Sequence, residues 1–109
     1  MKLGYLAAAA VMALYALPGA AQAGGCRAVV YWDIDYGGER FVTDHDVSYV
    51  GDHWNDKISS IKVISGEWEF FWDANYGGEA LRLGPGRYRY VGDHWNDQIS
   101  SFRCVRPTG

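Results

Sequence analysis

Two short polar turns are the part of this sequence best suited to chemistry. Residues 55–60 read Asn-Asp-Lys-Ile-Ser-Ser, and residues 96–101 read Asn-Asp-Gln-Ile-Ser-Ser. Each turn offers carboxylate, amide, hydroxyl and main-chain carbonyl oxygens, a set that suits Ca²⁺ and is poor for zinc or copper. One turn cannot supply the roughly six to eight oxygens that Ca²⁺ takes, whereas two neighbouring turns with water can. Asn, Asp and Ser also favour turns by bonding to their own backbone, but the two near-identical copies favour calcium.

The two turns belong to a duplicated sequence. Residues 31–39 align with residues 71–79 at an offset of 40, with six of nine positions identical. Residues 49–60 align with residues 90–101 at an offset of 41, with eleven of twelve identical. After its first 23 residues the chain therefore consists of two copies of a unit of about 40 residues.

Each unit also carries an aromatic residue, four residues, a second aromatic, one residue and a glycine. The two copies of this signature are Tyr31, Tyr36 and Gly38, and Phe71, Tyr76 and Gly78. A strand that folds back on itself needs a residue free to take a positive φ, and glycine does so without strain. We therefore predict that each glycine shapes a folded hairpin over which the aromatic pair packs.

The rest of each unit has the composition of β-strands. Alternating, β-branched or aromatic stretches predict strands at residues 28–32, 40–43, 58–64, 68–72, 80–83 and 99–105. Glycine, proline, asparagine and aspartate separate them, and no sustained helical stripe follows residue 23. Seven or eight short strands predict an all-β antiparallel sandwich in which the two units bury their apolar faces against each other.

The paired hairpin signatures and the paired Asn-Asp-x-x-Ser-Ser turns together resemble the βγ-crystallin family, and the resemblance covers all of residues 24–109. It implies one β-sandwich of two Greek-key motifs related by a pseudo-twofold axis. The motifs would span residues 27–65 and 67–106. The chain has one domain where the lens proteins have two, and residues 1–23 and the two cysteines, Cys26 and Cys104, predict a leader and a disulfide. These departures favour a secreted microbial type.

The resemblance also implies a pair of Ca²⁺ ions, each clamped by residues of both motifs. Asp56 and Asp97 would give side-chain oxygens, and Ser59 and Ser100 would give hydroxyls. Main-chain carbonyls would come from Lys57 and Gln98, with Ile34 and Ala74 as further carbonyl donors in the hairpins. Asn55, Asn96, Ser60 and Ser101 would shape the turns. The sequence leaves open which arm pairs with which.

The first residues predict export. Lys2 precedes an apolar stretch at residues 6–17, and Ala21-Gln22-Ala23 has the small-x-small form of a signal peptidase site. Residues 1–23 are therefore expected to be removed, leaving a secreted or periplasmic protein. Because such compartments are oxidising, the two cysteines, Cys26 and Cys104, are expected to form a structural disulfide.

Composition limits the partners and the activities. Without Lys2 the chain has 9 Lys+Arg against 13 Asp+Glu, a net charge of −4. With no basic run, we expect no nucleic-acid partner and no docking on anionic lipid. We also expect no enzyme, because common hydrolase motifs are absent.

Other chemistry in the repeats is less favoured. His53 and His94 would make only half of a zinc site, since no third ligand recurs beside them. The duplicated carboxylates could serve a glycosidase only if their environments differed, which symmetric copies disfavour; they are Asp33 and Asp73, and Glu39 and Glu79.

Two alternative functions remain open. One is a small secreted metalloproteinase inhibitor of crystallin-like fold that uses residues 44–48 or 84–89 as its protruding loop. The other is an envelope or carbohydrate-binding module that uses Trp54 and Trp95. The leading prediction is a calcium-binding domain whose folded state is stabilised by the ion through mass action.

Overall fold

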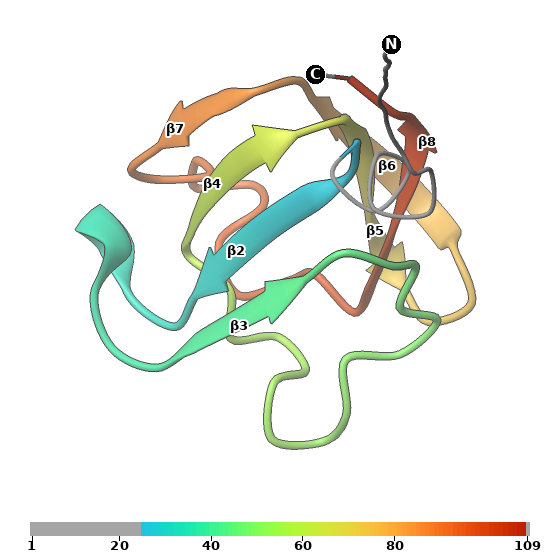
Figure 1. The fold of residues 1–109 in the computed structure, drawn as a ribbon. Helices are drawn as coiled ribbons and strands as arrows, with labels where there is room; N and C mark the ends of the chain where they lie inside the picture. Colours follow the sequence, from blue (N-terminus) through green and yellow to red (C-terminus); the bar gives the residue numbers. More distant parts are fainter. Residues whose placement is uncertain (1–24, 109) are drawn as a thin grey trace, which may run out of the picture.

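Two antiparallel sheets face each other across a hydrophobic core (Figure 1). The computed structural model describes residues 25–108, and the expected signal segment, residues 1–23, lies outside them. The strands are β2 (Arg27–Tyr31), β3 (Arg40–Thr43), β4 (Ser60–Ser65), β5 (Glu67–Asp73), β6 (Gly77–Leu83), β7 (Gly86–Tyr88) and β8 (Ser101–Arg106). A 3-10 turn, η1 (Ile34–Tyr36), is the single helical element between residues 25 and 108. The predicted all-β sandwich is confirmed.

The two sheets do not coincide with the two sequence repeats. One sheet has the order β3-β2-β4-β7 and the other the order β6-β5-β8. Strand β7 lies in the second repeat, yet it pairs with β4 of the first repeat, with Ile61 opposite Tyr88. Reciprocally, Val47 of the first repeat forms a bridge with Phe102 on β8. Because each repeat completes the sheet of the other, their polar turns come together.

The core follows from the strand alternation. On β2 and β4 every second residue points inward, and Val30, Ile61 and Val63 are almost fully buried. The second sheet contributes Trp68, Phe70 and Phe102. From the two polar turns, Ile58 and Ile99 also enter the core with no exposed surface. Burial of these two isoleucines anchors each turn to the sandwich by about 1.5–3 kcal/mol of hydrophobic free energy.

Two predicted strands are shorter than expected. Residues 58–59 and 99–100 lie outside β4 and β8, which begin at Ser60 and Ser101. The amide of Ser59 donates to the carbonyl of Tyr31, and the carbonyl of Ser59 accepts from Val91 of the other repeat. The turns are therefore hydrogen-bonded to segments of both repeats instead of extending one ladder.

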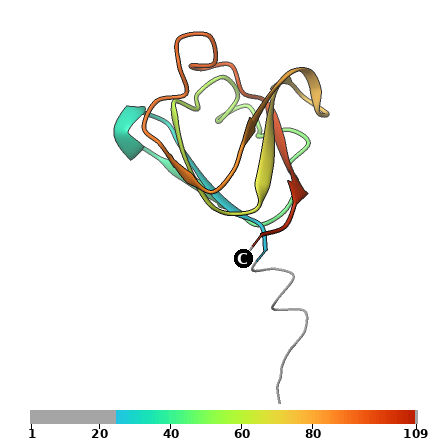
Figure 2. The same ribbon diagram turned by 90° about the horizontal axis from the view of Figure 1, so that it is seen from above.

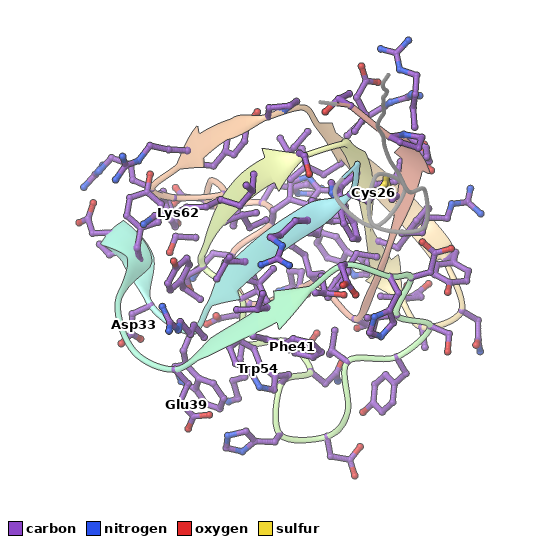
Figure 3. The ribbon with its side chains drawn as sticks, viewed as in Figure 1. Cys26, Asp33, Glu39, Phe41, Trp54 and Lys62 are labelled. Atoms are coloured by element: carbon purple, nitrogen blue, oxygen red, sulfur yellow. A yellow bond between two sulfur atoms is a disulfide. The ribbon has the colours of Figure 1, made fainter. Side chains whose placement is uncertain are left out.

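A disulfide closes the end of the sandwich opposite the polar turns. Cys26 precedes β2 and is bonded to Cys104 on β8, with Cα atoms 6.2 Å apart and a sequence separation of 78 (Figure 3). In Figure 2 the two sheets appear as layers that converge near the C-terminus. The predicted disulfide is confirmed. Between residues 25 and 108, no helix is long and apolar enough to cross a membrane.

Candidate metal centre

The folded hairpins form the outer wall of each candidate site. In the first repeat, Gly38 has a φ of 72° and the rings of Tyr31 and Tyr36 meet edge-to-face at 5.6 Å. The Ser60 hydroxyl donates to the carbonyl of Asp33 at 2.6 Å and accepts from the amide of Tyr36 at 3.0 Å. This buried serine therefore ties the end of the polar turn to the hairpin.

The second repeat builds the same wall. Gly78 has a φ of 74°, and Phe71 meets Tyr76 at 5.8 Å. The Ser101 hydroxyl donates to the carbonyl of Asp73 and accepts from the amide of Tyr76. Both hairpins thus have the glycine and aromatic geometry expected from their signature.

Six non-glycine residues also have positive φ, which the sequence did not predict. In the hairpins these are Asp35, Tyr36, Asn75 and Tyr76, and in the polar turns they are Asp56 and Asp97. Asn and Asp tolerate the left-handed region because their short side chains bond locally. In the two tyrosines this conformation is supported by a hydrogen bond, which each tyrosine amide donates to a buried serine hydroxyl.

The two polar turns lie directly against each other. The amide of Asp97 donates to the carbonyl of Ile58 at 3.1 Å, and the amide of Asp56 approaches the carbonyl of Ile99 at 3.4 Å. These bonds run between the two repeats and are related by the internal pseudosymmetry. Each turn is therefore fixed by its partner turn.

The side chains of the turns also cross from one repeat to the other. The Ser59 hydroxyl lies 3.3 Å from Asp97 Oδ1, and the Ser100 hydroxyl donates to Asn55 Oδ1 at 2.6 Å. Both serines are nearly buried. Each serine thus faces the polar side chain of the opposite turn. In the second pair that partner is Asn55 instead of Asp56, a departure from the role of Asn55 that the resemblance implies.

Main-chain contacts gather the rest of each site. The amide of Asp35, the residue after Ile34, donates to the carbonyl of Arg89 at 2.8 Å. Two residues further along the chain, the amide of Val91 donates to the carbonyl of Ser59. The hairpin carbonyl of Ile34 thus belongs to the neighbourhood of Ser59 and Asp97.

The second neighbourhood is equivalent. The amide of Asn75, beside Ala74, donates to Ser48 at 2.7 Å, and the amide of Val50 donates to Ser100 at 2.9 Å. The carbonyl of Ala74 therefore belongs with Ser100 and the residues 55–56.

Several oxygens of these neighbourhoods remain available as acceptors. Among the backbone hydrogen bonds of residues 25–108, none ends on the carbonyl of Lys57 or Gln98. Within the same range, Asn96 Oδ1 is buried and accepts no hydrogen bond. A buried oxygen without a donor is costly unless a cation or water satisfies it, so the oxygen set fits a hard cation.

The charge around the turns has the sign that a cation needs. The Tyr49 hydroxyl donates to Asp52, and the pKa of Tyr49 is raised by that hydrogen bond and by the nearby carboxylates, including Asp56. Tyr90 repeats this with Asp93. The carboxylates of Asp52 and Asp56, and of Asp93 and Asp97, thus place negative charge close to both phenols.

Histidine and glutamate form a second repeated pair near the turns. His53 Nε2 lies 2.8 Å from Glu39 Oε1 and its ring is 4.8 Å from that of Trp32. His94 contacts Glu79 and Trp72 in the same way. Both members of each pair recur between the repeats, which is the signal in the sequence that links them. Each glutamate thus has a histidine as its hydrogen-bond partner.

No zinc-like cluster accompanies these pairs. Across residues 25–108, no three His, Cys, Asp or Glu side chains are placed to hold a metal ion. The candidate calcium sites are of a different kind, because each would have one carboxylate and otherwise hydroxyl and main-chain carbonyl oxygens.

The tryptophans and loops named for the alternative functions are held by the fold. Trp54 is half-buried and packs against Phe41 at 5.8 Å and Trp32 at 5.5 Å (Figure 3). Trp95 packs on Trp72 in the second repeat. Residues 84–89 contain strand β7 and so form part of a sheet edge.

Comparison with known proteins decides the family. A family profile described as Beta/Gamma crystallin matches residues 27–105. The chain belongs to the βγ-crystallin family.

Other βγ-crystallins agree in sequence and in fold. A Beta/gamma-crystallin of Ciona intestinalis is 35% identical over 63 residues, which covers 57% of this chain and 75% of that protein. The crystal structure of an archaeal βγ-crystallin is 43% identical with a TM-score of 0.70, covering 74% of this chain and 99% of that one. A Ciona intestinalis βγ-crystallin structure is 31% identical with a TM-score of 0.66, covering 72% and 98%.

Proposed function

We propose that this βγ-crystallin is a non-enzymatic, exported domain that binds two Ca²⁺ ions at its paired polar turns and is stabilised by them. The observation that carries the proposal is the crossing of the turns, in which Ser59 faces Asp97 and Ser100 faces Asn55. Two oxygen-rich turns that are each too small for Ca²⁺ lie side by side, as a shared site requires.

The ligands of each ion come from both repeats. Asp97, Ser59 and the carbonyl of Ile34 would hold one ion, and the carbonyls of Lys57 and Gln98 would contribute one to each. Asp56, Ser100 and the carbonyl of Ala74 would hold the other. When bound, the ion supplies positive charge that neutralises the crowded carboxylates.

Stabilisation follows because the unfolded chain has no such site. When free calcium exceeds the Kd by a factor of about 100, each independent ion adds about 2.7 kcal/mol to the free energy of unfolding. Extracellular calcium modules often have Kd values of about 10⁻⁴–10⁻³ M, a range in which calcium acts mainly as a stabiliser.

Thermal melting with calcium and with chelator tests the proposal. We expect Asp56→Ala with Asp97→Ala to abolish the rise in Tm that calcium causes. The matched control is Asp52→Ala with Asp93→Ala, which removes the same charge from the same loops but leaves the proposed ligands in place. The proposal is wrong if millimolar calcium does not raise the Tm of the parent protein. The ligand assignment is wrong if both double variants respond equally.

A further inference from the structure

The outer face of the four-stranded sheet carries cations that have no carboxylate partner. Because Val30, Ile61 and Val63 point into the core, the alternate residues of the same strands face outward. On these strands the outward cations are Arg27 and Lys62. Arg40 on β3 and Arg87 on β7 lie opposite the outward residues Tyr31 and Lys62, so they share this face. None of the ion pairs formed within residues 25–108 includes any of the four.

The outer face of the three-stranded sheet is different. Arg82 bonds to Glu67 at 3.0 Å, and Arg106 also bonds to Glu67. Arg103 bonds to Glu69 at 3.2 Å. The three arginines on that sheet therefore all have carboxylate partners, so unpaired cations are not a general property of this fold.

The duplication shows how the difference arises. Lys62 is the counterpart of Arg103 at the offset of 41, and both cations lie above an aromatic hairpin pair, with Lys62 Nζ 4.7 Å from the Tyr36 ring. Arg103 lies opposite Glu69 in the strand register. Lys62 lies opposite Val29, the counterpart of Glu69 at the offset of 40.

The same exchange occurs at two more positions. Glu67 of the second repeat corresponds to Arg27 of the first, and Asp46 at the edge of the three-stranded sheet corresponds to Arg87. Where the three-stranded sheet has Glu67, Glu69 and Asp46, the four-stranded sheet therefore has Arg27, Val29 and Arg87. A chain with a net negative charge therefore has one basic face.

Lys62, labelled in Figure 3, forms the centre of this face together with Arg87, which lies opposite it in the strand register. They are direct register partners on β4 and β7 and line a hollow of about 440 Å³ together with Ile64 and Pro85. Ile64 is 56% exposed, so the hollow has an exposed apolar side chain beside its two cations.

Arg27, at the far end of the face, is less available. The pKa of Asp44 is lowered mainly by its hydrogen bond with His45 and, to a smaller extent, by Arg27. The site therefore centres on Lys62 and Arg87.

We propose that this face docks an acidic segment of another protein, whose carboxylates pair with Lys62 and Arg87 while an aliphatic side chain enters the hollow beside Ile64. Complementary charge sets the sign of the partner, and the apolar patch requires a partner with both carboxylates and aliphatic groups. Sugars and nucleic-acid bases need a free aromatic face to stack on. Here Lys62 and Arg87 already cover the ring of Tyr36, which favours a polypeptide.

The test uses the exported chain, residues 24–109, and a capped fluorescent peptide of glutamates with one central leucine. Fluorescence anisotropy at low ionic strength should show binding that weakens as salt is added. Lys62→Gln with Arg87→Gln should weaken it at least tenfold. The control, Arg82→Gln with Arg103→Gln, changes the net charge equally on the other sheet and should change the affinity less than twofold.

A second variant tests the origin of the site without removing a cation. Val29→Glu recreates the ion pair of the other repeat in the same register, so it should fold normally and weaken peptide binding to a similar degree. Circular dichroism and melting verify its fold.

Several outcomes would overturn the proposal. These are no binding at low salt, equal losses in the two glutamine variants, and an undiminished affinity in Val29→Glu. Replacing the leucine by serine must weaken binding. A sulfated polysaccharide or single-stranded DNA that binds more tightly than the peptide would identify a non-specific polyanion site instead.

Discussion

The disulfide gives the most quantitative prediction. The double variant Cys26→Ala with Cys104→Ala removes a cross-link between two residues that are 78 positions apart in the sequence. The chain-entropy relation then predicts a loss of about 4.5 kcal/mol in the free energy of unfolding at 25 °C. For a domain of this size that corresponds to a fall in Tm on the order of 20–30 °C.

Urea unfolding in chelator measures this loss. Because the cross-link acts mainly on the unfolded chain, the variant should also show a larger m-value, since its unfolded state is more expanded. A loss below about 1 kcal/mol would refute the entropic reasoning.

Calcium should restore much of what the disulfide variant loses. Cys26 precedes β2, and Ile34, a proposed carbonyl ligand, follows it in η1, so the cross-link and a proposed calcium site lie at opposite ends of the same strand. Two ions at about 100 times their Kd would together add about 5 kcal/mol. If the disulfide-free variant folds but calcium does not raise its free energy of unfolding, the expectation that calcium compensates for the lost cross-link is wrong.

Three further perturbations have defined expectations. Gly38→Ala should reduce the free energy of unfolding by about 1–3 kcal/mol, because Gly38 has a φ of 72° and a Cβ would lie 2.7 Å from a carboxylate oxygen. Gly84→Ala, at a position with open space, is the control, and an equal loss there would contradict the argument. Ser60→Ala should lower the urea midpoint through a loss of about 1–3 kcal/mol, because it leaves two partly buried backbone groups of the hairpin without their hydrogen-bond partner; an unchanged midpoint would show that water replaces the hydroxyl. The pKa of Glu67 is lowered, chiefly by its hydrogen bond from Arg106, so its stabilisation is present at neutral pH and lost as the pH falls below its usual 4.5. Urea midpoints at neutral and acid pH should therefore differ less in Glu67→Gln than in the parent.

Much of the fold was predictable because the duplication makes its signals redundant. The folded hairpins follow from Gly38 and Gly78, whose spacing from the aromatics recurs. The burial of Ile58 and Ile99 agrees with the sequence pattern, in which each is the apolar residue of an otherwise polar turn.

The missing parts depend on contacts between the repeats. The exchange of β7 into the other sheet leaves no local trace, since its three residues, Gly86–Tyr88, resemble a loop. The contact between Ser100 and Asn55 likewise depends on how two distant turns meet. The basic face was hidden because a net charge averages over both sheets, although the replacement of Glu69 by Val29 was visible in the aligned repeats.

Calorimetric titration of the chelator-stripped protein with Ca²⁺ tests the central claim most directly. The account predicts two bound ions per chain, with Asp97→Ala retaining one and Asp56→Ala with Asp97→Ala retaining none. Absence of binding heat at millimolar calcium, confirmed by an unchanged Tm, would contradict it.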